Sequence, residues 1–368
     1  MSTPVHAAKL HRRCLLTATA ITLGGAGLAS AAGRPAAADP HHFASGSLAD
    51  AVVDAIRQHQ LVGIGEEPVH GLQEHHDQLQ LTITDPRLVG LVDDVVVEFA
   101  NPLYQDTIDA FVVDGKPVSD ADLRLVWRDT TQSPRQTWDN PVYEQFFRRL
   151  RAVNWRLPAA ERIRVLAGDP VIDWSTITDR SQIPLERRDS YAASVINEQV
   201  LARGRRALVC YGGGHLFHTD LPTPSIASLV EQQTGVRMYT IMDLVALQGD
   251  PGGLGAKLAT TARGTVITTN RTWLGELPAQ DALPGKNVES RSNFLYCDVP
   301  LGRLYDAGLH LGRPDLLTES SPNPAIYLDS AYWTELQRRA AIQGVGDLGP
   351  LRQQQPAGYP PLEGAAAC

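Results

Sequence analysis

The stretch RRALVCYGGGH, residues 205–215, decides the fold class of this chain. Its apolar run is typical of a buried strand, and the three glycines that follow allow the backbone to approach a ligand closely. A helix is predicted before it, over 185–204 and closed by Gly204, and another after it, over 223–235 and closed by Gly235. A further apolar strand follows over 236–244. This order of strands and helices is typical of an α/β protein.

The same alternation extends toward the N-terminus. The predicted strands and helices on that side are a helix over 47–60 capped by Ser47, a strand over 61–65, a helix over 72–83, a strand over 93–100, a helix over 140–157 and a strand over 162–170. Continuous apolar strands separated by helices indicate a mostly parallel central sheet with helices on both faces.

Residues 47–343 are expected to form a single α/β domain with a helical insertion at about 104–140. The insertion has little apolar periodicity but contains Trp127 and Trp138, and we expect it to act as an arm or lid that shapes substrate choice. After residue 250 the chain is rich in Gly and Pro, which predicts an irregular C-terminal extension with one strand over 264–270 and a closing helix over 330–343. The tail, residues 344–368, is predicted to be disordered.

Residues 1–38 have the layout of a signal peptide. Three basic residues precede an apolar run from Leu15 to Ala32, and small-residue cleavage patterns follow. The pair Arg12-Arg13 partly matches a twin-arginine signal. We therefore expect an exported protein, secreted or in the cell envelope, with no permanent membrane span after cleavage.

Charge and cysteines narrow the choice of partners. The formal charge is −8 for the whole chain, and removal of four basic residues with the leader makes it more negative, which disfavours a nucleic-acid partner and leaves a small molecule or a peptide. Cys210 lies in an apolar strand and is expected to be buried and inert. Cys297 and Cys368 are a possible disulfide pair.

Three predicted strands end in Glu or His residues. Glu66, Glu67 and His70 follow the first strand, Glu98 ends the second, and the glycine turn presents His215, with His218 three residues later. Because parallel strands end at one edge of their sheet, these side chains are expected to converge on one crevice. A Glu and a His close together can position water, share a proton or hold a metal.

Several familiar sites are absent from the sequence. There is no GxSxG elbow, no HExxH helix and no GxxxxGK[ST] loop, and Pro68 interrupts the dinucleotide-like GIGEEP. The adjacent His75 and His76 point about 100° apart on a helix, so we expect at most one of them in the site and His76 at the surface.

The ordered motifs GE…HG, VVVEF, RRDSYAASVINEQV and VCYGGGHLF resemble the superfamily that contains erythromycin esterases, ChaN-like haem-binding proteins and Tiki/TraB-type proteases, over about residues 61–243. The resemblance implies five site residues: Glu66 or Glu67 as the first carboxylate, with Glu66 preferred and Glu67 then solvated, followed by His70, Glu98, Arg188 and His215.

The resemblance also implies three possible activities. In the esterase-like hypothesis His70 is a general base that activates water, His215 assists the leaving group, and Arg188 anchors a substrate carboxylate or an oxyanion. In the protease-like hypothesis the same groups hold a divalent metal, and in the ChaN-like hypothesis they bind haem or another small ligand without catalysis. A structural alternative is that the strand-end residues only cap helices and pair with Arg188, Arg162 or Arg128.

Overall fold

The computed structural model describes residues 44–67, 69–135, 137–218, 224–245, 254–279, 299–313 and 316–353. Eight strands within these ranges form one sheet in the order β1-β7-β8-β6-β2-β5-β3-β4. The strands are β1 Ala44–Ser47, β2 Leu61–Glu66, β3 Asp94–Val97, β4 Arg164–Ala167, β5 Ala207–Gly212, β6 Tyr239–Val245, β7 Thr265–Thr268 and β8 Ala307–Gly312. Strands β8 to β4 in this order are parallel, whereas β7 and β1 are antiparallel to their neighbours. The predicted α/β class with a mostly parallel sheet is confirmed.

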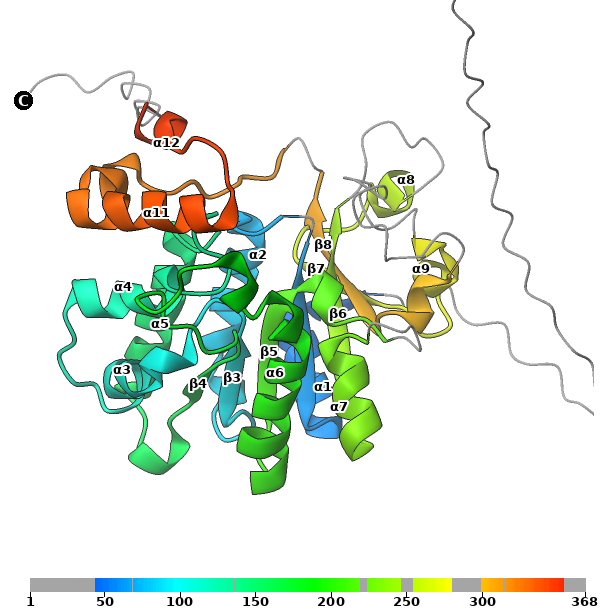
Figure 1. Cartoon of the computed structure of the whole chain (residues 1–368). Helices are drawn as coiled ribbons and strands as arrows, with labels where there is room; N and C mark the ends of the chain where they lie inside the picture. The colour runs from blue at the N-terminus through cyan, green and yellow to red at the C-terminus, as the bar shows by residue number, and fades with distance from the viewer. Residues whose placement is uncertain are drawn as a thin grey trace, which may run out of the picture. The chain divides into compact units, whose positions relative to one another are not determined.

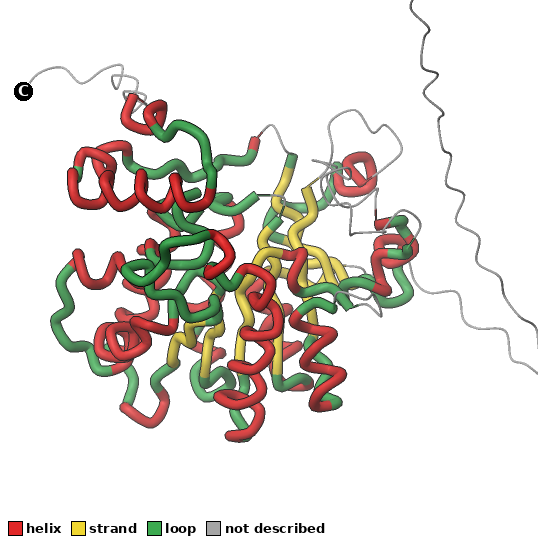
Figure 2. Tube along the Cα trace, viewed as in Figure 1, coloured by secondary structure: helices red, strands yellow, loops and turns green. Residues whose placement is uncertain are grey.

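Helices cover both faces of the sheet, and Figure 2 shows the strands as a central layer between them. The helices are α1 Leu48–Gln58, α2 Gln73–Ile83, α3 Gln105–Ile108, α4 Asp120–Arg128, α5 Pro141–Asn154, α6 Arg188–Val195, α7 Ile226–Thr234, α8 Leu254–Leu258, α9 Trp273–Glu276, α11 Ser330–Gln343 and α12 Gly349–Gln353. Successive side chains of each strand point to opposite faces of the sheet, so the core has two parts. On one face they pack against α1, α2, α4 and α5, and on the other against α6 and α7.

The local sequence explains the ends of these helices. Ser47 caps α1 by accepting the N–H of Asp50, as predicted. The predicted helix over 185–204 begins at Arg188, changes to a π-turn over Ile196–Val200 and a 3₁₀ turn over Leu201–Arg203, and ends at Gly204. Gly204 and Gly235 both adopt left-handed conformations at helix ends, which a side chain would disfavour.

The C-terminal half differs most from the sequence prediction. Strand β8 was not anticipated, yet it lies between β6 and β7 in the sheet. Its sequence AGLHLG has two glycines and a histidine, so its apolar signal is weak. Residues 349–353 of the predicted disordered tail form α12, and residues 354–368 lie outside the described residues. The predicted leader and the Cys297–Cys368 pair lie outside the described residues.

The predicted insertion at about 104–140 is helical in its first part, which includes α3 and α4. Its apolar side chains, among them Val126, Trp127 and Trp138, are buried in the main core. Residues 129–135 form turns rather than a helix. No helix among the described residues has the length and apolar character needed to cross a bilayer.

We expect burial, rather than helix propensity, to hold α2 against the sheet. Leu79 is 1% exposed and packs in the core, whereas Leu81 on the same helix is 63% exposed. Leu79→Ala should lower the free energy of unfolding by about 2–5 kcal/mol because it leaves a cavity. Leu81→Ala is the matched control and should change it by less than about 0.5 kcal/mol. Equal effects in urea unfolding would show that this packing is unimportant.

Candidate functional site

The carboxyl ends of β2, β3 and β5 lie side by side. Glu66 is in register with Gly212, and Val97, the last residue of β3, is in register with Cys210. Glu98 follows directly and is 1% exposed. The three strand ends therefore bring the predicted carboxylates and histidines to one edge of the sheet, where a parallel sheet binds its ligands.

Glu66 is the most heavily bonded carboxylate of this edge. Its Oε2 lies 2.9 Å from Nδ1 of His70, and its Oε1 lies 3.0 Å from Nε2 of His76. The N–H of Gly71 donates to Oε1 at 2.5 Å, and the hydroxyl of Tyr143 donates to Oε2 at 3.1 Å. Burial alone would raise the pKa of Glu66, but His76 and His70 hold that pKa well below its ordinary value. Glu66 is therefore a fixed anion that orients His70.

His70 presents its other edge to the opening of the site. Its side chain is 28% exposed, and its ring packs edge-on against Trp138 with ring centroids 4.7 Å apart. Gly212 makes room for it, because a Cβ at this glycine would lie 3.0 Å from Cε1 of His70 and 3.5 Å from Oε2 of Glu98. Gly212 thus contacts both His70 and Glu98 closely.

The charge state of His70 follows from its neighbours. Burial lowers the pKa of this imidazole, but the negative charges of Glu98, Glu66 and Glu67 and the hydrogen bond to Glu66 outweigh burial and raise the pKa to about 9. At neutral pH His70 is consequently an imidazolium, which donates protons rather than accepting them.

Glu98 is surrounded by donors. Arg188 donates from Nη2 to Oε1, Gln132 donates from Nε2 to Oε1 at 2.9 Å, and the N–H of Gly212 donates to Oε2 at 2.7 Å. Burial would raise the pKa of Glu98, but Arg188, His70 and His215 lower it to about 2.

Arg188 also lies 3.4 Å from Oδ1 of Asp169, measured from its Nε. Asp169 in turn accepts the N–H of Thr131 at 2.6 Å and its hydroxyl at 2.7 Å. Burial raises the pKa of Asp169 to about 6 despite these partners. With two buried carboxylates beside it, Arg188 is engaged within the protein, and the expectation that it anchors a substrate carboxylate is not supported.

His215, like His70, has its Nδ1 bonded to a carboxylate. Its Nδ1 lies 2.5 Å from Oδ1 of Asp189, the residue after Arg188 on α6. Its Nε2 faces Oε1 of Glu98 at 3.7 Å, and its side chain is 26% exposed. Burial lowers the pKa of His215, but Asp189 and Glu98 raise it more, while Arg188 opposes them. This edge of the sheet therefore holds two imidazoles, each oriented by a carboxylate at Nδ1.

The structure corrects three details. His76 is not at the surface: it is 1% exposed and bonds Glu66, while His75 is 2% exposed and pairs with Asp243 at 2.8 Å. Both adjacent histidines therefore support the site, and their ring centroids lie 5.2 Å apart. Glu67 is not solvated, because it is 6% exposed and accepts the N–H of Gly214 at 3.1 Å. His218 points elsewhere and bonds Asp306.

Sequence reasoning missed several members of the site. Tyr143 and Gln132 have no distinguishing pattern, because both belong to segments whose position depends on tertiary packing. Asp189 did carry a signal, since it directly follows Arg188 in the Arg-Asp motif. Asp169 follows a buried strand in the same way as Glu98, so the strand-end rule would have found it.

A metal ion or haem at this edge would need donor atoms with free lone pairs. Within the described ranges no group of three His, Cys, Asp or Glu side chains is arranged to hold a metal. The lone pairs of Glu66 and Glu98 are occupied by protein donors, and Nε2 of His215 faces Glu98 at 3.7 Å. Among the described residues, neither His70 nor His215 lines one of the cavities at this edge. Haem binding would need Nε2 of at least one of these histidines to face an open cavity. The donor set as arranged does not fit either group.

Three cavities adjoin one another near this edge. One is lined by Glu66, Glu98, Trp138 and their neighbours, and a second lies between Trp127, Trp138 and Tyr332. A wider groove continues outward from Trp127 and Arg128 over the start of α5. Trp127 and Trp138 therefore lie between the predicted site and the outer groove.

Comparison with known proteins matches no family model and no curated protein sequence. Solved structures do match. A protein from Bacillus cereus superposes with a TM-score of 0.52 at 11% identity, over 76% of this chain and 97% of that one.

A mutant erythromycin esterase, EreC, in its open conformation gives a TM-score of 0.47 at 10% identity, over 74% of this chain and 94% of that one. ChaN of Campylobacter jejuni, solved with cofacially bound haem, gives 0.34 at 12% identity, over 53% and 85%. A structural likeness at such low sequence identity says nothing about activity. The solved structures that this chain is similar to include members of the superfamily that the sequence resembles, an erythromycin esterase and a ChaN protein, and the superposition on the Bacillus cereus protein shows the fold alone.

Proposed function

We propose that this protein is a hydrolase that uses water to cleave an ester or an amide. The single observation that carries the proposal is the pair of histidines around Glu98. His70 and His215 each have Nδ1 bonded to a carboxylate, at 2.9 and 2.5 Å. Nε2 of His215 lies 3.7 Å from Glu98, and the charge of Glu98 also raises the pKa of His70. A histidine whose Nδ1 is tied to a carboxylate is oriented for proton transfer through Nε2.

The unequal electrostatics of the two histidines support distinct roles. With a pKa of about 9, His70 is a poor base at neutral pH, so we exchange the roles expected from the sequence. His215 accepts the proton of the attacking water as its oxygen bonds to the carbonyl carbon. His70 donates its proton to the leaving oxygen or nitrogen as that bond breaks. Glu98 favours the charged form of both rings, and proton exchange with solvent restores neutral His215 and protonated His70 before the next turnover.

The same charges favour an uncharged substrate. Arg188 is paired with Glu98 and Asp169, so it does not supply a free cation to attract an acidic group. Glu66, Glu67 and Glu98 would repel such a group. We therefore propose a neutral ester, lactone or amide, and we propose, from the leader-like residues 1–38, that the protein acts after export.

Haem binding is the alternative function. The histidines are engaged as described above, and no contact in the described residues favours it over hydrolysis. A titration with haem that produced a Soret shift, lost in His70→Ala or His215→Ala, would favour it instead.

We expect His70→Ala and His215→Ala each to lower kcat/KM by about 10²–10⁴-fold, because each removes one proton-transfer group. The measurement uses p-nitrophenyl esters, N-acyl p-nitroanilides and a macrocyclic lactone. Both variants should keep the far-UV spectrum, since both side chains are partly exposed. His59→Ala, located before β2 at the opposite edge of the sheet, is the control and should keep full activity. If the wild-type protein cleaved every compound no faster than a variant carrying both His70→Ala and His215→Ala, the proposed hydrolase function would be refuted.

The pH profile tests the assigned roles. Activity requires His215 neutral and His70 protonated, so kcat/KM should be bell-shaped and fall at high pH with an apparent pKa of about 9. The charge of Glu67 helps to raise the pKa of His70. Glu67→Gln should therefore let His70 lose its proton at lower pH and move the falling limb in that direction. A falling limb that stays in place in Glu67→Gln would contradict the role of His70 as the acid.

A further inference from the structure

The turn of residues 129–133, between α4 and α5, contacts the two buried carboxylates that hold Arg188. Thr131 donates to Asp169 through its N–H and its hydroxyl, and Gln132 donates to Glu98 at 2.9 Å. Within this turn the backbone forms a single hydrogen bond, from the N–H of Ser133 to the carbonyl of Thr130 at 3.2 Å, although Asp129, Thr131 and Ser133 are buried. Its conformation must therefore be fixed by side chains from other parts of the chain.

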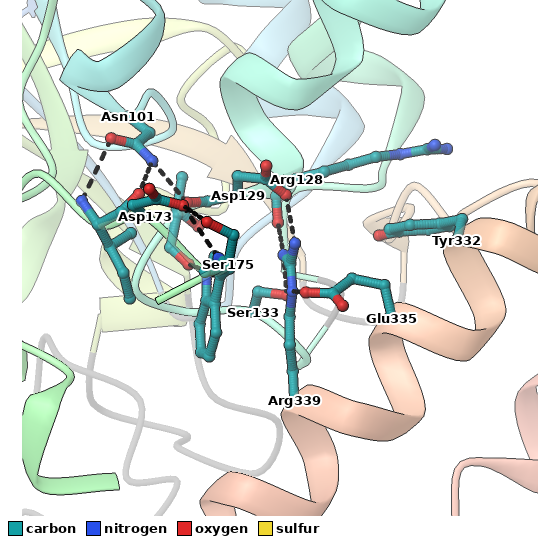
Figure 3. Close-up of polar contacts among 12 residues, drawn as sticks. Asn101, Arg128, Asp129, Ser133, Asp173, Ser175, Tyr332, Glu335 and Arg339 are labelled. Carbon is teal, nitrogen blue, oxygen red and sulfur yellow. Dashed lines mark hydrogen bonds and ion pairs between the residues drawn. The ribbon is translucent and has the colours of Figure 1, made fainter. Parts of the chain in front are cut away.

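Helix α11 supplies the largest share of those side chains (Figure 3). Arg339, 4% exposed, donates from Nη2 to Oδ1 of Asp129 at 2.6 Å and from Nη1 to the carbonyl of Arg128 and the hydroxyl of Ser133, both at 3.0 Å. From the next turn of the helix, Gln343 donates to the carbonyl of Ser133. The planar guanidinium thus bonds both ends of the turn at once.

The remaining contacts come from the core and from the loop after β4. Asn101 donates to the carbonyl of Asp129 at 2.8 Å, the hydroxyl of Tyr104 donates to the carboxylate of Asp129 at 2.6 Å, and the indole of Trp174 donates to the carbonyl of Thr130 at 3.0 Å. Asp129 is the centre of this network, and Arg339 is the cation bonded to it at 2.6 Å. A buried carboxylate of this kind depends on its paired cation.

We propose that Arg339 is a positioning residue for the site: by fixing the 129–133 turn it places Thr131 and Gln132 on Asp169 and Glu98. It acts through these residues and touches neither histidine. Only the turnover readout rests on the proposed function, because the position of Glu98 also affects the pKa values of the two site histidines. Glu98 raises the pKa of both His70 and His215. Looser packing of the turn would admit water and weaken that coupling.

The test compares Arg339→Met with Arg338→Met. Arg338 is the neighbouring arginine of the same helix, and it bonds Glu335 and the carbonyls of Trp174 and Ile177 without contacting the turn. Imidazole pKa values are measured by NMR on the full chain, with kcat and KM measured on the ester of the panel that is cleaved fastest. Arg339→Met should lower both imidazole pKa values toward 6.5 and reduce kcat about ten- to a hundredfold. Arg338→Met should leave both as in the wild type.

A second variant keeps the test decisive if Arg339→Met does not fold. The double variant Thr131→Val with Gln132→Ala removes the contacts of the turn with Asp169 and Glu98 and leaves α11 intact. It should lower the two imidazole pKa values in the same way as Arg339→Met. Adding Arg339→Lys to this double variant should change those pKa values little further. Unchanged imidazole pKa values in these variants, or equal changes in Arg338→Met, would overturn the proposal. The NMR result does not depend on turnover, so a failure to find any hydrolysed compound would refute the proposed function and leave this inference separately tested.

Discussion

The burial of carboxylates at the ends of parallel strands is the constraint on which the rest of the site depends. Glu66, Glu98 and Asp169 are each less than a tenth exposed, and an unpaired buried anion is costly. Each carboxylate therefore requires donors. His70 and His76 bond Glu66, Arg188 pairs with Glu98 and Asp169, and the 129–133 turn donates to the same two carboxylates. Satisfying these three anions is what brings α2, α5, α6 and the turn together at one edge of the sheet.

The same constraint makes two similar histidines chemically different. His70 lies among three glutamates, which hold it protonated, whereas His215 has Arg188 nearby to oppose its carboxylates. Both imidazole pKa values are raised, and Arg188 opposes the rise at His215, so the two rings lie in different electrostatic surroundings. Trp138 packs against His70, and Trp127 lines the outer groove.

Local patterns predicted most of the fold because its strands are short apolar runs between capped helices. They predicted Glu66, His70, Glu98 and His215 because a residue after a buried parallel strand must lie at the common edge. They failed where position depends on distant packing. His76 looked like a surface residue until α5 was seen to cover that side of α2 with Tyr143, and β8 is held by pairing on both sides rather than by its own sequence. Arg339 is over 200 positions from the turn it bonds, and no local signal could reveal that contact.

The titration of the His70 imidazole in the wild-type protein tests the account most directly. Its resonances can be assigned by their loss in His70→Ala and followed by ¹H–¹⁵N NMR between pH 5 and pH 10, without any substrate. We predict that Nδ1 of His70 stays protonated and bonded to Glu66, and that the imidazole titrates with a midpoint of about pH 9. A midpoint at or below the ordinary histidine value of about 6.5 would mean that the three glutamates do not act together on this ring, and the assignment of His70 as the proton donor would be wrong.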